Sequence, residues 1–222
     1  LRRAEKHDSV RAVVLTGKGR AFSAGADLKA GFPEGDFTVE DQLQNEYRPS
    51  LRSITTMPKP VIAAVNGSAA GIGLSFALAA DITIMADTAF LLSPFTTISL
   101  VGDGGCNWLL VNQLGYRKAF ELSILSERID AATAVSLGLA NRVVPADDLL
   151  AETLALAETI AARAPLSIAA TKKAMRYAAH ATYEATFDLE AKLQRELMGG
   201  DDNIEGVTAF LEKRAPAFKG QS

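Results

Sequence analysis

The chain has 222 residues, of which 48% are hydrophobic and 22% are charged, a balance typical of one soluble globular domain or one domain with an appendage. The formal net charge of −3 gives no electrostatic reason to expect a nucleic-acid partner. A single cysteine, Cys106, excludes an internal disulfide and fits a reducing compartment, and two histidines far apart in sequence argue against a histidine-based metal site.

The first predicted element is a buried strand. Residues 10–16, VRAVVLT, form a near-continuous apolar run that is typical of a central parallel strand. Residues 17–31 follow with four glycines and predict a flexible turn. The basic residues of this turn are either a solvated loop face or neighbours of a phosphate group: Lys18, Arg20 and Lys29.

A loop and a helix follow this turn. Residues 32–37 contain a proline and a glycine and predict the loop. Residues 38–57 carry apolar side chains at helical spacing and stop before Pro58, so they predict the helix.

Residues 60–86 are the stretch around which the sequence is organised. They read as a strand, a turn punctuated by glycines, a short helix over 74–80 and a strand over 82–85. A glycine-rich turn that opens a helix directs unpaired N–H groups at whatever lies there. The pattern therefore predicts a site for an anion, or for an oxygen that becomes anionic. Asn66, Asp81 and the glycines interrupt the apolar run, so we expect no membrane span.

The next segment contains Asp103, a carboxylate with a candidate role in catalysis. Residues 89–93 predict a short strand, and glycines then surround Asp103 just before a helix that begins at 107. Asp103 is either an N-cap of that helix or a catalytic carboxylate, and composition alone favours the cap. Trp108 is expected in the core.

The remainder is predominantly helical. A short strand is expected over 139–144, and Asp201, Asp202 and Asn203 are an expected N-cap cluster for the last helix. The predicted helices span residues 117–125, 131–137, 149–164, 165–179, 182–198 and 204–214. The fold class is therefore α/β over residues 1–145 with a helical region over 146–222, whose amphipathic faces suggest self-association.

Four stretches together resemble one family over nearly the whole chain. They are AFSAGADLK (21–29), PKPVIAAVNGSAAGIGLSFALAADI (58–82), LVGDGGCNWLL (100–110) and GVTAFLEKRAPAFKG (206–220). In this order they resemble the crotonase superfamily, the enoyl-CoA hydratase/isomerases. The resemblance implies a crotonase (ClpP/crotonase-like) spiral of ββα units with a C-terminal helical trimerisation region. It also implies that the family's first strand–turn segment is missing from this sequence.

The resemblance implies an acyl-CoA thioester as substrate, with no metal or redox cofactor. Two backbone N–H groups, those of Ala26 and Ile72, would hold the thioester oxygen as it becomes an enolate. The family often has glycine where Ile72 stands. Substrate-binding positions implied by the motifs are Ala24, Asp27, Leu28, Ala70, Gly71, Ser75, Phe95 and Val101. Phe218 and Lys219 are weak candidates for contacting coenzyme A.

The catalytic carboxylates of the family's hydratases align with Ser75 and Phe95, so both acids are absent and a simple hydratase is not expected. LVGDGGCNWLL resembles instead the branch of the phenylacetate-pathway ring-epoxide isomerase and the 3,2-enoyl-CoA isomerases, in which an Asp at the position of Asp103 shuttles the proton. The resemblance thus favours Asp103 as the base. Gly102 and the Cys106-Asn107 pair depart from that branch.

The resemblance leaves alternatives open. Another crotonase activity is possible, such as residual hydration, thioester hydrolysis or dehalogenation, although Asn107 and Asn112 stand where the nucleophilic Asp of a dehalogenase is expected. A non-catalytic acyl-CoA-binding protein would need the two amides but not Asp103. We expect a cytoplasmic homotrimer or hexamer in fatty acid metabolism or phenylacetate catabolism.

Overall fold

The computed structural model describes residues 1–30 and 37–220, so most of the loop predicted over 32–37 lies outside the described residues. The chain divides into two compact units. The first comprises Leu1 and residues 14–55 and 61–154, and the second comprises residues 2–13, 56–60 and 155–222. The predicted boundary between a core over residues 1–145 and a helical region over residues 146–222 stays a prediction.

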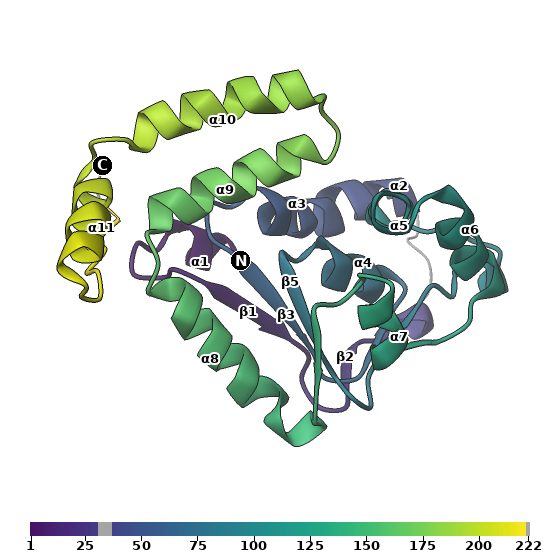
Figure 1. Cartoon of the computed structure of the whole chain (residues 1–222). Coiled ribbons are helices and arrows are strands. Elements are labelled where there is room, and N and C mark those ends of the chain that lie inside the picture. The colour runs from purple at the N-terminus through teal and green to yellow at the C-terminus, as the bar shows by residue number, and fades with distance from the viewer. Residues whose placement is uncertain (31–36, 221–222) are drawn as a thin grey trace. The chain divides into compact units, whose positions relative to one another are not determined.

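The first unit contains two four-stranded sheets, ordered β1-β3-β5-β8 and β2-β4-β6-β7. Figure 1 labels β1, β3 and β5 of the first sheet and β2 of the second. The first sheet consists of β1 (Val13–Thr16), β3 (Val61–Val65), β5 (Ile82–Ala86) and β8 (Arg142–Val144). β3 and β5 run parallel, and every residue of β3 is buried, which explains its unbroken apolar sequence. The strands predicted here are confirmed, although β1 and β8 are shorter than expected.

In the second sheet, β6 (Phe90–Leu92) confirms the strand predicted over 89–93, whereas the sequence did not predict the other strands. This sheet consists of β2 (Ala21–Ser23), β4 (Ser68–Ala70), β6 and β7 (Ile129–Asp130). β2, β4 and β6 run parallel, and β7 is antiparallel to β6. The sequence predicted only turns where β2 and β4 lie, because three residues are too few to produce a recognisable alternation.

The first unit also contains several helices. α2 (Val39–Gln42), a π-helical turn over Leu43–Tyr47 and α3 (Arg48–Thr56) replace the single helix predicted over 38–57. α4 packs against α5, which packs against α6 (Figure 1). The remaining helices of this unit are α4 (Ile72–Ala79), α5 (Cys106–Leu114), α6 (Tyr116–Leu125) and α7 (Ala131–Ser136), with 3-10 turns over Leu28–Ala30, Phe95–Ile98 and Ala146–Asp148. Trp108 on α5 is 49% exposed, so its predicted place in the core is wrong.

The second unit is helical, as predicted. α1 (Arg2–Lys6), α9 (Pro165–Ala178), α10 (Tyr183–Leu197) and α11 (Asp201–Glu212) belong to it, together with the second half of α8 (Leu149–Ala161). α11 begins three residues before the predicted start. Its N-cap is Gly200, which makes no side-chain cap, so the predicted N-cap cluster is wrong.

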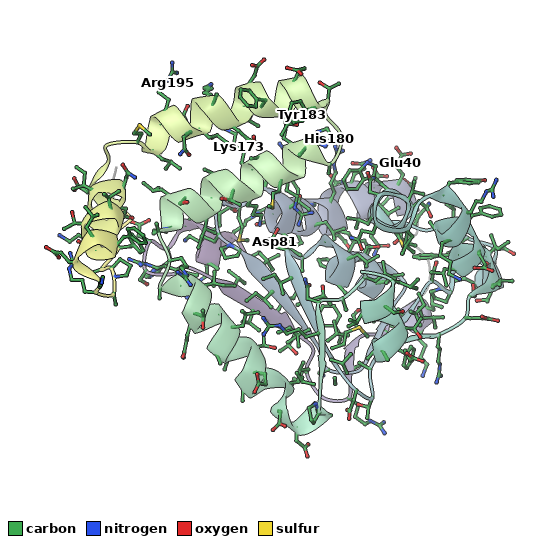
Figure 2. The ribbon with its side chains drawn as sticks, viewed as in Figure 1. Glu40, Asp81, Lys173, His180, Tyr183 and Arg195 are labelled. Atoms are coloured by element: carbon green, nitrogen blue, oxygen red, sulfur yellow. The ribbon has the colours of Figure 1, made fainter. Side chains whose placement is uncertain are left out.

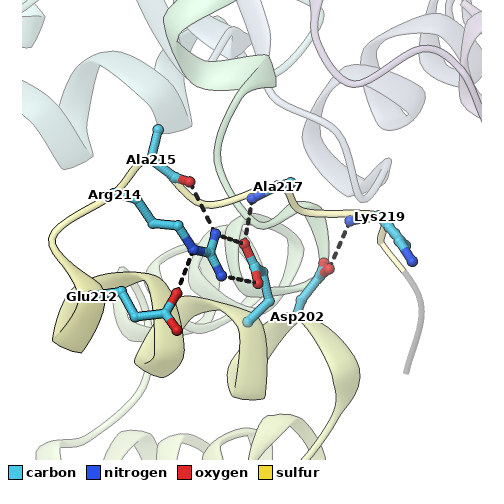
Figure 3. A network of polar contacts seen from close by, with 7 residues as sticks. Asp202, Glu212, Arg214, Ala215, Ala217 and Lys219 are labelled. Atoms are coloured by element: carbon cyan, nitrogen blue, oxygen red, sulfur yellow. Dashed lines mark hydrogen bonds and ion pairs between the residues drawn. The ribbon is translucent and has the colours of Figure 1, made fainter.

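The chain after α11 folds back onto that helix through a network of polar contacts (Figure 3). Arg214 contacts both carboxylate oxygens of Glu205, at 2.6 and 2.9 Å, and Glu205 also accepts the N–H of Ala217 at 2.8 Å. These hydrogen bonds lower the pKa of Glu205 to about 2. Asp202, which the sequence assigned to a cap, instead accepts the N–H groups of Lys219 (2.7 Å) and Gly220 (2.9 Å).

Phe218 and Lys219 therefore belong to an ordered return segment. A β-carbon at Gly206 would lie 3.4 Å from the ring of Phe218, so this ring covers α11. It also lines a cavity of about 410 Å³ between α9, α10 and α11.

Apolar side chains on the helices of this unit are open to solvent. Tyr183 is 76% exposed and Phe210 is 82% exposed. Figure 2 shows Arg195 projecting outward from α10. Self-association through such faces remains a prediction. Among the described residues, no helix is both long enough and apolar enough to cross a membrane.

Candidate active site

Two glycine-rich turns meet at one edge of the second sheet. β2 and β4 pair in parallel, with Ser23 opposite Ala69, so the turns that follow them emerge at the same edge. Gly25 (φ +104°) lies in one turn and Gly71 (φ +56°) in the other. A β-carbon at Gly25 would lie 3.3 Å from the carbonyl oxygen of Ala70, and one at Gly71 would lie 3.5 Å from Gly25 Cα. The two backbones therefore approach as closely as glycine permits.

Each of these glycines immediately precedes a predicted amide donor. Ala26 follows Gly25, and Ile72 follows Gly71 as the first residue of α4. The first N–H groups of a helix have no carbonyl partner within the helix, and the helix dipole makes this end electropositive. The two residues predicted to hold a thioester oxygen are thus on adjoining turns. That the N–H groups of Ala26 and Ile72 hold a thioester oxygen stays a prediction.

The start of α4 is fixed tightly against β2. A β-carbon at Gly73 would lie 2.5 Å from Ser23 Cβ and 2.7 Å from the carbonyl oxygen of Ser23. The glycine therefore sets the separation between the two turns, because any side chain would push the helix away from the strand.

The third parallel strand brings the next pair of predicted positions to this edge. β6 ends at Leu92, whose carbonyl oxygen accepts the N–H of Gly71 at 3.2 Å. Phe95 begins the 3-10 turn that follows and is 6% exposed. Ser75, in the first turn of α4, is fully buried. The ring of Phe95 and the hydroxyl of Ser75 thus occupy the two positions at which the sequence predicted that catalytic acids are missing.

The turn that carries Asp103 rests on α4. The hydroxyl of Ser75 donates to the backbone carbonyl of Asp103 at 2.8 Å. A β-carbon at Gly104 (φ +60°) would overlap Ile72 Cδ1 and lie 3.0 Å from both Leu51 Cδ1 and Ser75 Cβ. Asp103 is therefore held beside the residue that supplies one predicted donor.

The side chain of Asp103 does not cap α5. The N-cap is Gly105, and it receives no side-chain hydrogen bond, so the capping interpretation is wrong. Asp103 is half-buried, and its Oδ1 atom is shielded from solvent without a hydrogen-bond partner among the described residues. Burial raises the pKa of this carboxyl above its ordinary 3.8, partly opposed by a backbone hydrogen bond. A buried carboxylate without a partner is costly to stability and is typical of a group kept for chemistry.

The two departures from the isomerase pattern contact each other. Asn107 Nδ2 donates to the carbonyl oxygen of Gly102 at 3.1 Å. A β-carbon at Gly102 would lie 2.8 Å from Asn107 Oδ1, so the asparagine occupies the space that a larger residue would need. The two residues thus pack against each other and hold the turn.

The other predicted substrate-binding positions lie at the surface or in the second sheet. Ala70 is the last residue of β4 and is 8% exposed. Ala24 and Asp27 are exposed, and Asp27 accepts the N–H of Lys29 at 2.9 Å. Leu28 is 61% exposed and Val101 is 74% exposed.

Apolar side chains enclose Asp103 only in part. Leu100 and Val101 are exposed, at 48% and 74%, while Phe95 is buried. Leu51 and Ile72 contact the neighbouring Gly104 instead. The sequence offers no reason to single out Leu51, because in sequence it is one apolar position of an ordinary helix.

No group of three His, Cys, Asp or Glu side chains within residues 1–30 and 37–220 is arranged to hold a metal ion. Cys106 is buried, and burial raises the pKa of its thiol to about 11, so the thiol stays protonated at neutral pH. Lys18 and Arg20 are exposed.

The family model described as "Enoyl-CoA hydratase/isomerase" matches residues 1–221. The chain belongs to the enoyl-CoA hydratase/isomerase family. A "Probable enoyl-CoA hydratase" of Rhodobacter capsulatus is 44% identical over 211 residues, which cover 95% of this chain and 82% of that protein. The 1,2-epoxyphenylacetyl-CoA isomerase of Escherichia coli is 36% identical, with 100% of this chain and 86% of that protein covered.

The crystal structure of an enoyl-CoA hydratase from Bacillus anthracis superimposes with a TM-score of 0.93 at 32% identity, over 99% of this chain and 85% of that one. The crotonase fold predicted from the motifs is confirmed, and the protein is an acyl-CoA enzyme of this family. The names of the relatives include both hydratase and isomerase.

Proposed function

We propose that this enzyme is an acyl-CoA isomerase that moves a double bond, or opens a strained ring, through an enolate. The observation that carries the proposal is the carboxylate of Asp103 beside the start of α4, whose Oδ1 atom is shielded from solvent and has no hydrogen-bond partner among the described residues, combined with the absence of acids at Ser75 and Phe95. A single base that takes and returns one proton suffices for isomerisation, whereas hydration needs groups that position a water molecule.

In the proposed reaction the thioester oxygen accepts hydrogen bonds from the N–H groups of Ala26 and Ile72. Asp103 removes a proton from the carbon beside the carbonyl, and the C–H electron pair enters the thioester to form a dienolate. The negative charge rests on the oxygen between the two amides. Losing one such donor costs typically ~2.7–4 kcal/mol of barrier. The protonated Asp103 then returns the proton to a carbon further along the chain, the double bond moves into conjugation, and the carboxylate is regenerated.

The surroundings of Asp103 favour this role. Desolvation raises its pKa, which makes its carboxylate a stronger base than one in water. The hydroxyl of Ser75 is committed to the carbonyl oxygen of Asp103, so it supports the base rather than acting on water. The reaction needs no metal or redox cofactor.

Hydration is the second candidate, because a relative that is 44% identical is named as a hydratase. Incubation with crotonyl-CoA and, separately, with a 3-enoyl-CoA distinguishes the two candidates. The proposal predicts conversion of the 3-enoyl thioester to the 2-enoyl thioester and no efficient loss of crotonyl-CoA absorbance. Robust formation of the 3-hydroxyacyl product, without isomerisation, would reject it.

The same proposal includes a homotrimer or hexamer in the cytoplasm. Support comes from the exposed apolar side chains on α10 and α11, such as Phe187 (55%) and Leu211 (73%). Light scattering at micromolar concentration tests the assembly, and a stable monomer would contradict it. Phenylacetate catabolism is one possible setting, because one relative is named as an epoxyphenylacetyl-CoA isomerase.

A further inference from the structure

The side chain of Ile72 fills the space in front of Gly104. A β-carbon at Gly104 would overlap the Cδ1 atom of Ile72, so this methyl group is in van der Waals contact with the backbone of the glycine. Ile72 is the first residue of α4 and is only 5% exposed. The same residue therefore supplies a predicted amide donor with its backbone and contacts the Asp103 turn with its side chain.

Two further side chains contact Gly104. Leu51 Cδ1 from α3 and Ser75 Cβ from α4 each lie 3.0 Å from the β-carbon position. Leu51 is 8% exposed and Ser75 is fully buried. Ile72 and Ser75 are three residues apart, so they lie on the same face of α4. The backbone of Gly104 thus rests on three buried side chains, and the methyl group of Ile72 makes the closest of these contacts.

The peptide between Asp103 and Gly104 is held in one orientation. The carbonyl oxygen of Asp103 accepts the hydroxyl of Ser75 at 2.8 Å and the N–H of Cys106 at 2.9 Å. The hydrogen bond from Ser75 draws the turn toward α4, and the methyl group of Ile72 limits how closely the turn approaches. Because the peptide unit is planar, a change in the separation of Gly104 from α4 moves the backbone of Asp103 as well.

Ile72 has the properties of a spacer of constant length. A β-branched side chain has one strongly preferred χ1 rotamer in a helix, so it is stiff. The start of α4 is itself anchored to β2, because a β-carbon at Gly73 would lie 2.5 Å from Ser23 Cβ. A stiff side chain on an anchored helix end keeps the Asp103 turn at a fixed distance from the N–H of Ile72.

We propose that the side chain of Ile72 is a positioning group that sets the distance between the base, Asp103, and the amide donor of Ile72 itself, a role that rests on the proposed function for its catalytic consequence only. The proton to be removed and the oxygen that becomes negative belong to one substrate. The base and the donor must therefore match the separation of these two atoms, and a misplacement near 1 Å can cost on the order of 100-fold in rate.

The first test is Ile72→Val, with Ile84→Val as the matched control. Each substitution removes one buried δ-methyl group and keeps a β-branched side chain, so the two should cost similar stability. Ile84 is 0% exposed and lies on β5 of the first sheet, away from the edge of the second sheet where the site is.

The shortened spacer should let the Asp103 turn settle nearer to α4. Ile72→Val should therefore lower kcat for 3-enoyl-CoA isomerisation by ~3–10-fold with KM unaltered. Ile84→Val should keep the parent kcat. Equal values of kcat in the two valine variants would overturn the inference, because loss of a buried methyl group would then have the same effect anywhere in the core.

The second test is rescue of Gly104→Ala. The added β-carbon meets the Cδ1 atom of Ile72, and Ile72→Val removes that atom. The double variant Ile72→Val/Gly104→Ala should therefore be faster than Gly104→Ala by roughly 10-fold. Ile84→Val/Gly104→Ala should show no recovery. General destabilisation cannot produce this difference, because both double variants combine the same two kinds of change.

The titration of the Asp103 carboxyl reports its position without any need for activity. It is followed by 13C NMR in protein labelled at aspartate, with the resonance assigned by Asp103→Asn. Burial raises the pKa of Asp103, so Gly104→Ala, which moves the turn outward, should lower the midpoint by ~0.5 pH unit or more. Ile72→Val should restore it in the double variant. A midpoint that does not fall in Gly104→Ala, or that Ile72→Val does not restore, would overturn the inference.

The two proposals fail separately. If the parent does not isomerise a 3-enoyl-CoA but the Asp103 midpoint falls in Gly104→Ala and is restored by Ile72→Val, the proposed function is wrong and the positioning role of Ile72 stands. If the parent isomerises and Ile72→Val restores neither the rate nor the midpoint, the function stands and the positioning role is rejected.

Discussion

Gly104 and Gly105 offer a matched pair of substitutions beside the proposed base. Both have positive φ, at +60° and +82°. An alanine at either position pays a backbone cost of about 1–2 kcal/mol. Only Gly104 is crowded, because its β-carbon would meet Ile72, Leu51 and Ser75, whereas nothing lies within 4 Å of a β-carbon at Gly105. Comparing the two alanine variants therefore separates the effect of backbone strain in the turn from the effect of displacing the Asp103 turn.

Overpacking a well-packed site costs typically ~1–3 kcal/mol in addition to the backbone cost. Gly104→Ala should thus lose ~2–5 kcal/mol of unfolding free energy and Gly105→Ala ~1–2 kcal/mol. For a protein of this size the melting temperature should fall by ~4–20 °C and ~2–8 °C respectively.

The loss of isomerisation rate in Gly104→Ala should be larger than its loss of unfolding free energy alone would produce. Relief of the overlap moves the Asp103 turn away from the start of α4, and a displacement near 1 Å can cost on the order of 100-fold in rate. Isomerisation of a 3-enoyl-CoA should fall ~10–100-fold in Gly104→Ala, while Gly105→Ala should keep most of its rate. Differential scanning calorimetry and steady-state kinetics measure both effects. Equal losses in the two variants would refute the reasoning, because the contact with α4 would then have no role.

Three further predictions concern other contacts. Ser75→Ala removes the hydrogen bond to the Asp103 carbonyl, so it should cost about 1 kcal/mol in urea unfolding and lower kcat more than KM changes; an unaltered kcat would contradict this. Burial raises the pKa of Asp103, so its stability contribution is complete below the unfolded value of 3.8 and is lost as pH rises through the folded pKa. The melting temperature of Asp103→Asn should therefore rise relative to that of the parent as the pH increases from 4 to 7. A difference in melting temperature that stays constant over this range would argue against a cost of burying the charged carboxylate. Glu205→Gln weakens the bonds to Arg214 and Ala217, so amide exchange over residues 213–220 should accelerate without loss of isomerase activity, whereas unchanged exchange would show that Asp202 alone holds the segment.

The sequence predicted the long, buried elements well. β3 is a continuous apolar run of five residues, β5 is a buried run interrupted only by Thr83, and the helices after residue 146 have clear apolar spacing. The family resemblance pointed to the two turns and Asp103, and the structure brings the two turns to one edge of a sheet and packs the Asp103 turn against α4. The short strands β2 and β4 escaped prediction because parallel pairing, rather than local pattern, stabilises three-residue strands.

Other features could not be read from the sequence because they depend on packing. Asp103 was favoured by composition as a cap, but the backbone of Gly105 adopts the N-cap position and leaves the carboxylate without that role. Trp108 was expected in the core from its size, yet α5 turns it outward.

The central claim is that Asp103 is the base of an enolate isomerisation, and Asp103→Asn tests it most directly. The change preserves the shape of the side chain and removes its ability to accept a proton. General base catalysis contributes typically 10²–10⁴-fold, so kcat for conversion of a 3-enoyl-CoA to the 2-enoyl-CoA should fall by roughly that factor, which is ~3–5 kcal/mol of barrier. Affinity for the acyl-CoA and the melting temperature should not decrease. A variant that keeps most of its isomerase rate would contradict the account and leave the base of this site to be found elsewhere.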